Sequence, residues 1–491
     1  MLLQSSIYFG RRGEAAGRVR RAARGDWVRA ALFVAPVACA AAAILLVRSF
    51  LGFQFPVPWP DETGFVAPAF DFARTGSFFD PGMNPDRVVM WMPPGYMVLL
   101  AAAFRIFGYG YSLSRWISSL FCLASLGLAA RLAWQLAVGW RRVLAGWAVG
   151  MAFLTPYMLI DSNIARMEMP FCCLMLLALV ALVADRPYAA GALVALGGIV
   201  HFNAVYFAPI ILLAIVIRLR AGRLDWPRIM EFSVMAVAAL AFGLYAMHVL
   251  NNWPGFLADM QFQFHFKHSH AQHDLAHPLW IVLAGGALAG IVVLQHRACD
   301  AATLTACFGV AFLAMSHGGH EIWYDYGQPL GFALIAVSAT ANRNTAPNLD
   351  WAAGVSTVSA ALALSIGWSI TPAMAALRPH SAMLHRGVVA PAEIAKVRTF
   401  ITTLQPGEAV DFGWTGMELF FLDDLARADA HWTIIRHSVT QVWPFRSASW
   451  RVVCDSSEWP ALLLTFDIDH PRHGIDSGCD IIRIDGTMPK R

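Results

Sequence analysis

Long apolar runs separated by short polar segments occupy the first three quarters of the chain. A helix needs about 20 mainly apolar residues to cross the hydrocarbon core of a bilayer. The two short runs between residues 188 and 218 also fit one long kinked element. We expect a polytopic α-helical membrane domain over residues 27–374. Its eleven predicted spans lie at residues 27–50, 112–136, 143–160, 168–184, 188–203, 205–218, 229–250, 279–295, 300–316, 328–341 and 352–371.

The last quarter of the chain, residues 375–491, has a different pattern. Short strand-like runs at Arg451–Val453, Leu462–Phe466 and Ile481–Ile484 are separated by loops rich in Asp, Gly and Pro. A helix is expected near Ala390–Leu404. These segments predict a small α/β domain.

The composition indicates that the two parts lie in two different solvents. Of the 491 residues, 58% are hydrophobic and 14% are charged, whereas an ordinary soluble domain has about 25% charged residues. So few charges cannot cover the apolar surface of a soluble domain. A soluble enzyme, a nucleic-acid-binding protein and a disordered chain are therefore excluded.

The distribution of arginine predicts the orientation of the chain. Residues 1–30 contain seven Arg, and further Arg residues lie in the turns near 141–142 and 218–228. Short cytoplasmic loops are rich in Lys and Arg, so residues 1–26 are predicted to form a basic cytoplasmic arm. With eleven spans, the domain at 375–491 then lies in the periplasm of a bacterial inner membrane.

An acidic pair, Asp61–Glu62, directly follows the first predicted span. Carboxylates at a membrane boundary are costly to bury and usually face water or a polar cavity. The residues alone leave two interpretations open: a solvated loop with two ordinary acids, or a polar site at the membrane surface.

The order of motifs in this region resembles the polyprenyl-phosphate-sugar-dependent GT-C glycosyltransferases. That family includes protein O-mannosyltransferases and the lipid A aminoarabinose and galacturonic acid transferases. The resemblance covers residues 27–220 well, the later spans only by topology, and the α/β domain hardly at all. It implies a GT-C fold with in-plane helices in the first outer loop. The matching segments are Asp61–Glu62, Gly76, Pro93–Pro94–Gly95–Tyr96, Phe107–Gly108, Arg115 and Ala165–Arg166–Met167–Glu168.

The resemblance also implies roles for the acids. Transfer of a glycosyl group from a lipid phosphate needs a base for the acceptor, but no strong general acid, because the phosphate is already a good leaving group. Asp61 is the predicted base, with Glu168 as the second acid of the cavity and Glu62 as a substrate-positioning residue. The product is expected to have inverted anomeric stereochemistry.

The donor phosphate requires a counter-charge. Many relatives carry Lys or His directly before the Pro-Pro pair, where this chain has Met92. Arg74, Arg87, Arg166 and Lys267 are the predicted substitutes, although Arg166 also fits a simple ion pair with Glu168. Three further residues are predicted to bind substrate: Pro94, Tyr96 and Tyr324.

Residues 255–278 form a segment rich in His and Phe, which we expect to be a mobile interfacial loop that closes over the donor. On a helix, His270, His273 and His277 would share one face, so a divalent cation is an alternative. No cofactor is predicted to be required. Cys454 and Cys479 both lie in the predicted periplasmic domain, where they form either a disulfide or two free thiols.

The sequence thus predicts an integral-membrane glycosyltransferase. Its expected partners are a polyprenyl-phosphate-sugar donor, the membrane, and a periplasmic lipid, glycan or protein acceptor, with no nucleic acid. Neither a P-loop nor a GxGxxG motif is present, in keeping with a lipid-linked donor rather than a nucleotide sugar. The alternative is a transporter or flippase of lipid-linked glycans, although such proteins often show two similar halves and no internal repeat is found here.

Overall fold

The computed structural model describes most of the chain. The described residues are 5–51, 60–80, 82–84, 86–271, 279–295, 300–319, 324–341, 355, 358–359, 391–412, 416–433, 448–453 and 479–483.

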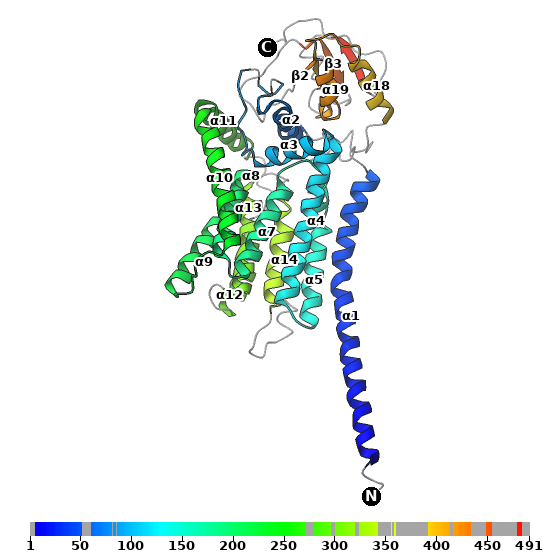
Figure 1. Cartoon of the computed structure of the whole chain (residues 1–491), viewed down its shortest axis with the longest axis vertical. Coiled ribbons are helices and arrows are strands. Elements are labelled where there is room, and N and C mark those ends of the chain that lie inside the picture. Colours follow the sequence, from blue (N-terminus) through cyan, green and yellow to red (C-terminus); the bar gives the residue numbers. More distant parts are fainter. Residues whose placement is uncertain are drawn as a thin grey trace.

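A bundle of apolar helices forms the body of the molecule (Figure 1). Ten of the eleven predicted spans coincide with helices, and the eleventh, 352–371, falls almost entirely outside the described residues. Two helices rather than one kinked element occupy 188–218, because a 3-10 turn (Phe202–Tyr206) separates them. The helices of the body are α1 (Ser5–Leu51), α4 (Tyr111–Leu136), α5 (Trp140–Phe153), α6 (Pro156–Asp161), α7 (Glu168–Val183), α8 (Pro187–Val200), α9 (Ala208–Arg220), α10 (Ile229–Asn251), α11 (Trp253–Ala271), α12 (Leu279–Gln295), α13 (Ala301–Gly319) and α14 (Gly327–Ala339).

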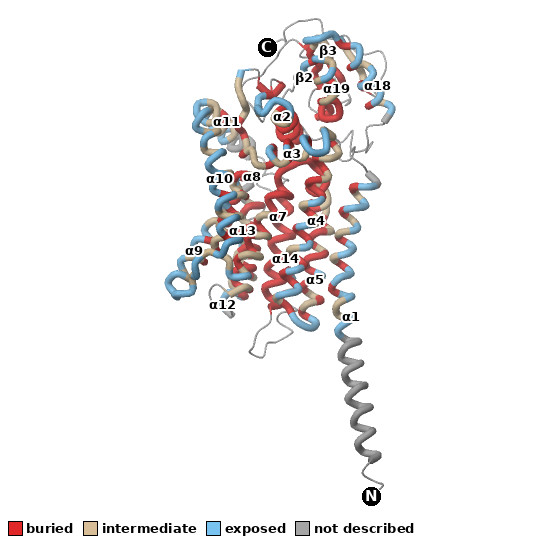
Figure 2. Tube along the Cα trace, in the orientation of Figure 1, coloured by how far each residue is buried: buried red, intermediate tan, exposed pale blue. Residues whose placement is uncertain are grey.

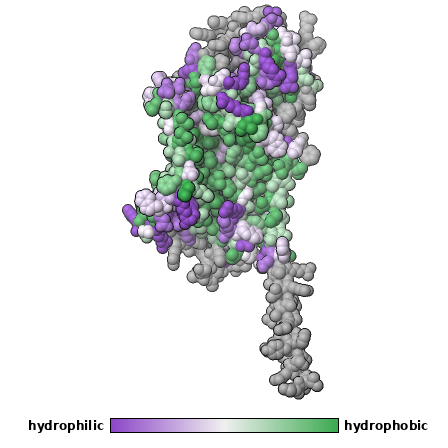
Figure 3. Space-filling view, viewed as in Figure 1, coloured by the Kyte–Doolittle hydropathy of each residue, from purple (hydrophilic) through white to green (hydrophobic). Residues whose placement is uncertain are grey.

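On the face seen in Figure 3, an apolar band crosses this body, with polar surface at both of its ends. Among the described residues, four helical segments are long and apolar enough to cross a membrane: Asp26–Ser49, Tyr111–Leu136, Phe202–Arg220 and Ile229–Asn251. Six shorter apolar helices accompany them. Large side chains along α10, such as Leu240 and Met247, are exposed, as Figure 2 shows for that helix as a whole. Such a continuous exposed apolar surface requires lipid as its solvent.

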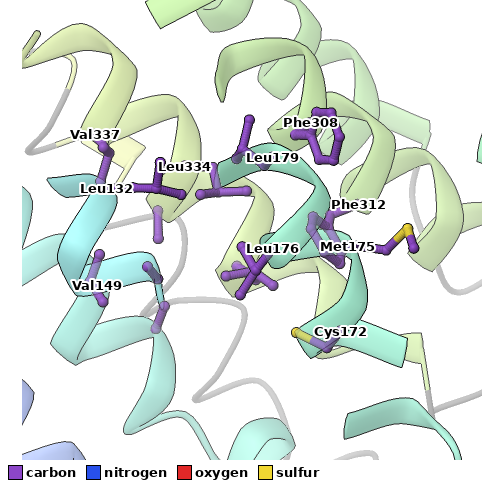
Figure 4. Packing of buried hydrophobic residues seen from close by; sticks show 14 of the residues in the cluster. Leu132, Val149, Cys172, Met175, Leu176, Leu179, Phe308, Phe312, Leu334 and Val337 are labelled. Atoms are coloured by element: carbon purple, nitrogen blue, oxygen red, sulfur yellow. The ribbon is translucent and has the colours of Figure 1, made fainter. Parts of the chain in front are cut away.

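Small residues and large side chains share the interior of the bundle. At Gly309 and Gly331 a Cβ atom would lie 2.7 and 2.6 Å from the carbonyl oxygen of the other glycine. These glycines therefore allow α13 and α14 to approach closely, as small residues do between membrane helices. Around this contact, buried side chains of α4, α5, α7, α13 and α14 interdigitate, with Leu176 and Phe312 among them (Figure 4).

Two further helices, α2 (Pro60–Thr75) and α3 (Gly95–Phe107), lie between the bundle and an α/β domain (Figure 1). This domain contains a four-stranded sheet in the order β2-β1-β3-β4, in which β1 pairs in parallel with β2 and β3, and β4 is antiparallel to β3. The predicted helix near 390–404 and two of the predicted strands are present, whereas 462–466 lies outside the described residues. The elements are α18 (Pro391–Ile401), β1 (Ala409–Asp411), α19 (Leu422–Arg427), β2 (His431–Thr433), β3 (Trp450–Val453) and β4 (Asp480–Arg483), with a short 3-10 helix, η5 (Met417–Phe420).

The α/β domain shares one hydrophobic core with α2 and α3. Trp432 of β2 stacks near Phe70 of α2, with ring centroids 6.4 Å apart, and it also packs against the backbone of Gly82. The hydroxyl of Tyr109 donates a hydrogen bond of 2.5 Å to the carbonyl of Leu419. These contacts fix the domain directly above α2 and α3.

The structure describes one of the two cysteines that were predicted to form either a disulfide or two free thiols in this domain. Cys479 is disulfide-bonded, whereas its predicted partner, Cys454, lies outside the described residues. The cysteines found free are Cys39, Cys122, Cys172, Cys173 and Cys307 of the membrane domain.

Candidate active site

The acidic pair lies in the first turn of α2. Pro60 begins this helix and Asp61 and Glu62 follow it, an arrangement that suits the fixed φ of proline and the positive end of the helix dipole. Successive residues of a helix point about 100° apart. The two carboxyl groups therefore face different partners.

Glu62 is fully buried and makes a network of four hydrogen bonds. Arg115 donates to it twice, from Nε to Oε2 at 3.0 Å and from Nη2 to Oε1 at 2.7 Å. The hydroxyl of Tyr111 donates to Oε1 at 2.9 Å, and the backbone N–H of Ala165 donates to Oε2 at 2.6 Å. Glu62 thus joins α2, α4 and the segment before α7.

Arg166 connects the other two predicted acids. Its Nη1 donates to Asp61 at 2.6 Å, and its Nε and Nη2 donate to Glu168 at 2.8–3.2 Å. Glu168 is buried, whereas the Asp61 side chain is 21% exposed. The sequence left open whether Arg166 binds substrate or pairs with Glu168; the structure shows this pair and adds Asp61 to it.

Two buried carboxyl groups near Arg166 and Glu168 were not predicted. Asp161, at the end of α6, is 5% exposed, and Asp325, in the turn before α14, is 1% exposed. Burial is the main cause that raises the pKa of Asp161 well above its ordinary value, and the charges of Glu168 and Asp325 add to the effect. The only signal in the sequence was their position in polar turns between spans.

The predicted aromatic and proline residues line the same region. Phe65 of α2 contacts Trp91 and Tyr96, with ring centroids 4.9 and 5.6 Å apart, and Pro94 is the N-cap of α3. Tyr324 is buried with its ring 5.3 Å from that of His201.

Arg87 is held by a residue that the sequence did not single out. Its guanidinium donates to both oxygens of Asp259 in α11, at 2.5 and 2.7 Å. Asp259 is fully buried and also accepts the backbone N–H of Met90 at 2.7 Å. This contact attaches α11 to the loop before α3.

The segment predicted as a mobile loop is helical from Trp253 to Ala271, so the loop interpretation is wrong for these residues. Residues 272–278 and the side chain of Lys267 lie outside the description. Within the described part of the chain, no group of three or more His, Cys, Asp or Glu is arranged to hold a metal ion. The His270, His273 and His277 face is therefore not tested.

The fold of this chain, a helical membrane body with two helices across its end and an α/β domain above them, is similar to that of ArnT from Cupriavidus metallidurans. Its apo structure has a TM-score of 0.50 at 16% identity, over 90% of this chain and 95% of that one. Its structure bound to undecaprenyl phosphate gives a TM-score of 0.51 at 16% identity, over 89% and 94%.

The oligosaccharyltransferase of Archaeoglobus fulgidus, in complex with Zn and sulfate, covers 88% of this chain and 69% of its own at 12% identity. Its TM-score of 0.43 is too low to support a conclusion. Neither the protein-family models nor the curated proteins gave a match. The comparisons thus show the fold and leave the function to the geometry of the site.

Proposed function

We propose that the protein is an integral-membrane glycosyltransferase that moves a sugar from a polyprenyl-phosphate donor to an acceptor on the side of the α/β domain. The observation that carries the proposal is the Asp61–Arg166–Glu168 cluster at the domain end of the bundle. A GT-C fold, shared with a structure that contains undecaprenyl phosphate, supports the same donor class.

In the proposed reaction an acceptor oxygen or nitrogen forms a bond to the anomeric carbon as the bond from that carbon to the phosphate oxygen breaks. The polyprenyl phosphate leaves with the electron pair, and the acceptor proton passes to Asp61. Direct displacement inverts the anomeric configuration. Asp61 suits the role of base because its carboxylate is partly exposed and has one of its oxygens engaged by Arg166.

Arg166 is the proposed counter-charge for the donor phosphate. Its Nε and Nη2 donate to Glu168, and its Nη1 donates to Asp61. A phosphate that binds Nη1 takes the place of Asp61 and releases this carboxylate for proton transfer, whereas Glu168 keeps the guanidinium in position. The catalytic role of Glu168 is then to hold Arg166.

The remaining predicted residues and segments are part of the same proposal. Tyr96, Tyr324 and Pro94 surround the sugar, Glu62 fixes the shape of the site, and Arg87 and Lys267 serve the donor. The arm at 1–26 is cytoplasmic, and the domain at 375–491 is periplasmic and contacts the acceptor. A polytopic protein of the bacterial inner membrane has this arrangement.

Transfer from undecaprenyl-phosphate sugars by the purified full-length protein tests the proposal. Asp61→Asn is expected to lower the transfer rate by at least 10²-fold, as removal of a general base does, and to keep the wild-type unfolding midpoint. Asp225→Asn, in the exposed connection between α9 and α10, is the matched control and retains full activity. Wild-type rates for Asp61→Asn would refute Asp61 as the base.

A further inference from the structure

A second pocket lies on the other side of Tyr111 from Glu62. It has a volume of about 520 Å³ and opens between the beginning of α4 and the α/β domain. Its walls are the turn Tyr109–Ser112 on the membrane side and, on the domain side, residues of α18, η5 and α19. The hydroxyl of Tyr111 binds Glu62, so this residue separates the pocket from the candidate active site.

The membrane side of the pocket is the N-terminus of a long helix. Helix α4 has 26 residues, its N-cap is Gly110, and none of the described side chains caps this end. The first turn contains no acidic residue. Because the first backbone N–H groups of a helix lack partners within it and the helix dipole is positive here, such an end attracts anions.

An independent observation points to an anion beside the residue that forms the membrane end of this pocket, Ser112. Arg48, in the last turn of α1, is only 2% exposed, and its Nη2 donates to Oγ of Ser112, which lines the pocket, at 3.2 Å. Its Nε and Nη1 are buried and have no hydrogen-bond partner. The ring of Trp116, 5.7 Å away, offers only a cation–π contact. A buried guanidinium whose only acceptor is a hydroxyl group, with no carboxylate hydrogen-bonded to it, is costly.

The charges on the domain side of the pocket balance one another. Arg398 pairs with Asp424 at 2.7 Å, and Arg427 pairs with Asp423. The acidic side chains therefore neither attract nor strongly repel an anion, but their remaining oxygens can accept hydrogen bonds from hydroxyl groups. The uncompensated positive charge is at the Arg48 end.

We propose that this pocket binds an anionic phospholipid, with the lipid phosphate at the beginning of α4, Arg48 as its counter-charge, and a hydroxyl-bearing headgroup toward Asp423 and Asp424. A lipid rather than a free phosphate is the ligand because α1 ends and α4 begins here, at the end of two candidate membrane spans. The headgroup region of a bilayer adjoins the ends of helices that cross its hydrocarbon core. The site is separate from the proposed glycosyl-transfer site and does not depend on it.

The test uses the full-length protein in detergent micelles. Native mass spectrometry measures retention of added phosphatidylglycerol, and thermal unfolding compares phosphatidylglycerol, phosphatidylcholine and inorganic phosphate. We expect preferential retention of, and stabilisation by, phosphatidylglycerol. Arg48→Gln is expected to weaken its retention about tenfold or more, the size of a lost charge-assisted hydrogen bond. Arg105→Gln, which removes an exposed cation from α3 at the same end, retains the lipid as wild type does.

Ser112→Tyr, which keeps Arg48 and fills the membrane end of the pocket, provides a second variant and is also expected to lose the lipid. Equal retention of phosphatidylglycerol by wild type, Arg48→Gln and Ser112→Tyr would overturn the proposal. Equal stabilisation of wild type by phosphatidylcholine would overturn it as well, and equal stabilisation by inorganic phosphate would overturn the assignment to a lipid.

Discussion

Replacing Glu62 with glutamine tests the buried network beside the candidate active site. Both carboxylate oxygens of Glu62 accept two hydrogen bonds each. Glutamine keeps one acceptor oxygen and replaces the other with an NH2 group. Turned toward Arg115 Nε and the Ala165 N–H, this group would face two fixed donors. Turned toward Tyr111 and Arg115 Nη2, it can donate to the tyrosine hydroxyl but still opposes one guanidinium N–H.

The second orientation is therefore the better one, and its cost follows from the contacts. One charge-assisted hydrogen bond is lost, and Arg115, which is fully buried, keeps its charge without a carboxylate partner. Breaking a buried ion pair by removing one partner costs about 3–5 kcal/mol. We expect Glu62→Gln to lower the free energy of unfolding by this amount.

Reversible unfolding in mixed detergent micelles measures this change. Asp61→Asn is the matched control, because the neighbouring side chain is partly exposed and Arg166 retains Glu168, so its cost is about 1 kcal/mol or less. A Glu62→Gln protein as stable as Asp61→Asn would show that the Glu62–Arg115 pair does not hold α2 to α4.

Three further outcomes are expected. Burial and then the neighbouring Asp80 raise the pKa of Asp71 to about 8; the folded state therefore binds a proton that the unfolded state releases, and the unfolding midpoint falls as pH rises from about 4 to 8. In Asp71→Asn the unfolding midpoint, measured over a series of pH values, no longer shows this decrease. The same decrease in Asp71→Asn as in wild type would contradict the raised pKa of Asp71. Asp259→Asn is expected to weaken the attachment of α11 and to lower the free energy of unfolding by about 2–3 kcal/mol. The backbone amides of residues 86–90 then exchange hydrogen faster than in wild type, and unaltered exchange rates would show that Asp259 does not attach α11 to this loop. Asp161→Asn resembles the protonated acid that burial favours, so its unfolding midpoint at pH 7 stays within a few degrees of wild type, and a loss as large as that of Glu62→Gln would show that Asp161 is ionised.

The bundle could be predicted because a helix that contacts lipid must be apolar along its own length, so that each span is visible in its own residues. Helices α4 and α10 lie where apolar runs of sufficient length predicted them. The segment at 255–271 has no such signal, since His, Gln and Phe alternate there without an apolar face. It is helical because it continues from α10 after a short break at Asn252 and because Asp259 binds Arg87.

The partners of Arg87 and Asp61 could not be predicted, because they are distant in sequence. Asp259 lies 172 residues from Arg87, and Arg166 lies 105 residues from Asp61. Arg87, which was predicted to bind the donor phosphate because it is near the Pro-Pro pair in sequence, therefore pairs with Asp259 of α11. Only the three-dimensional structure shows which arginine meets which acid.

Asp61 and Glu62 are adjacent in sequence, but the helix geometry turns their side chains toward different partners. Glu62 already has both oxygens occupied by four donors and no exposed surface. Accepting a proton would break at least one of these bonds and leave Arg115 without its full counter-charge. Asp61 has an oxygen without such a network and keeps 21% of its side chain exposed. Uptake of the proton from the incoming acceptor is therefore compatible with the first carboxyl group of α2 and not with the second, whatever sugar is moved.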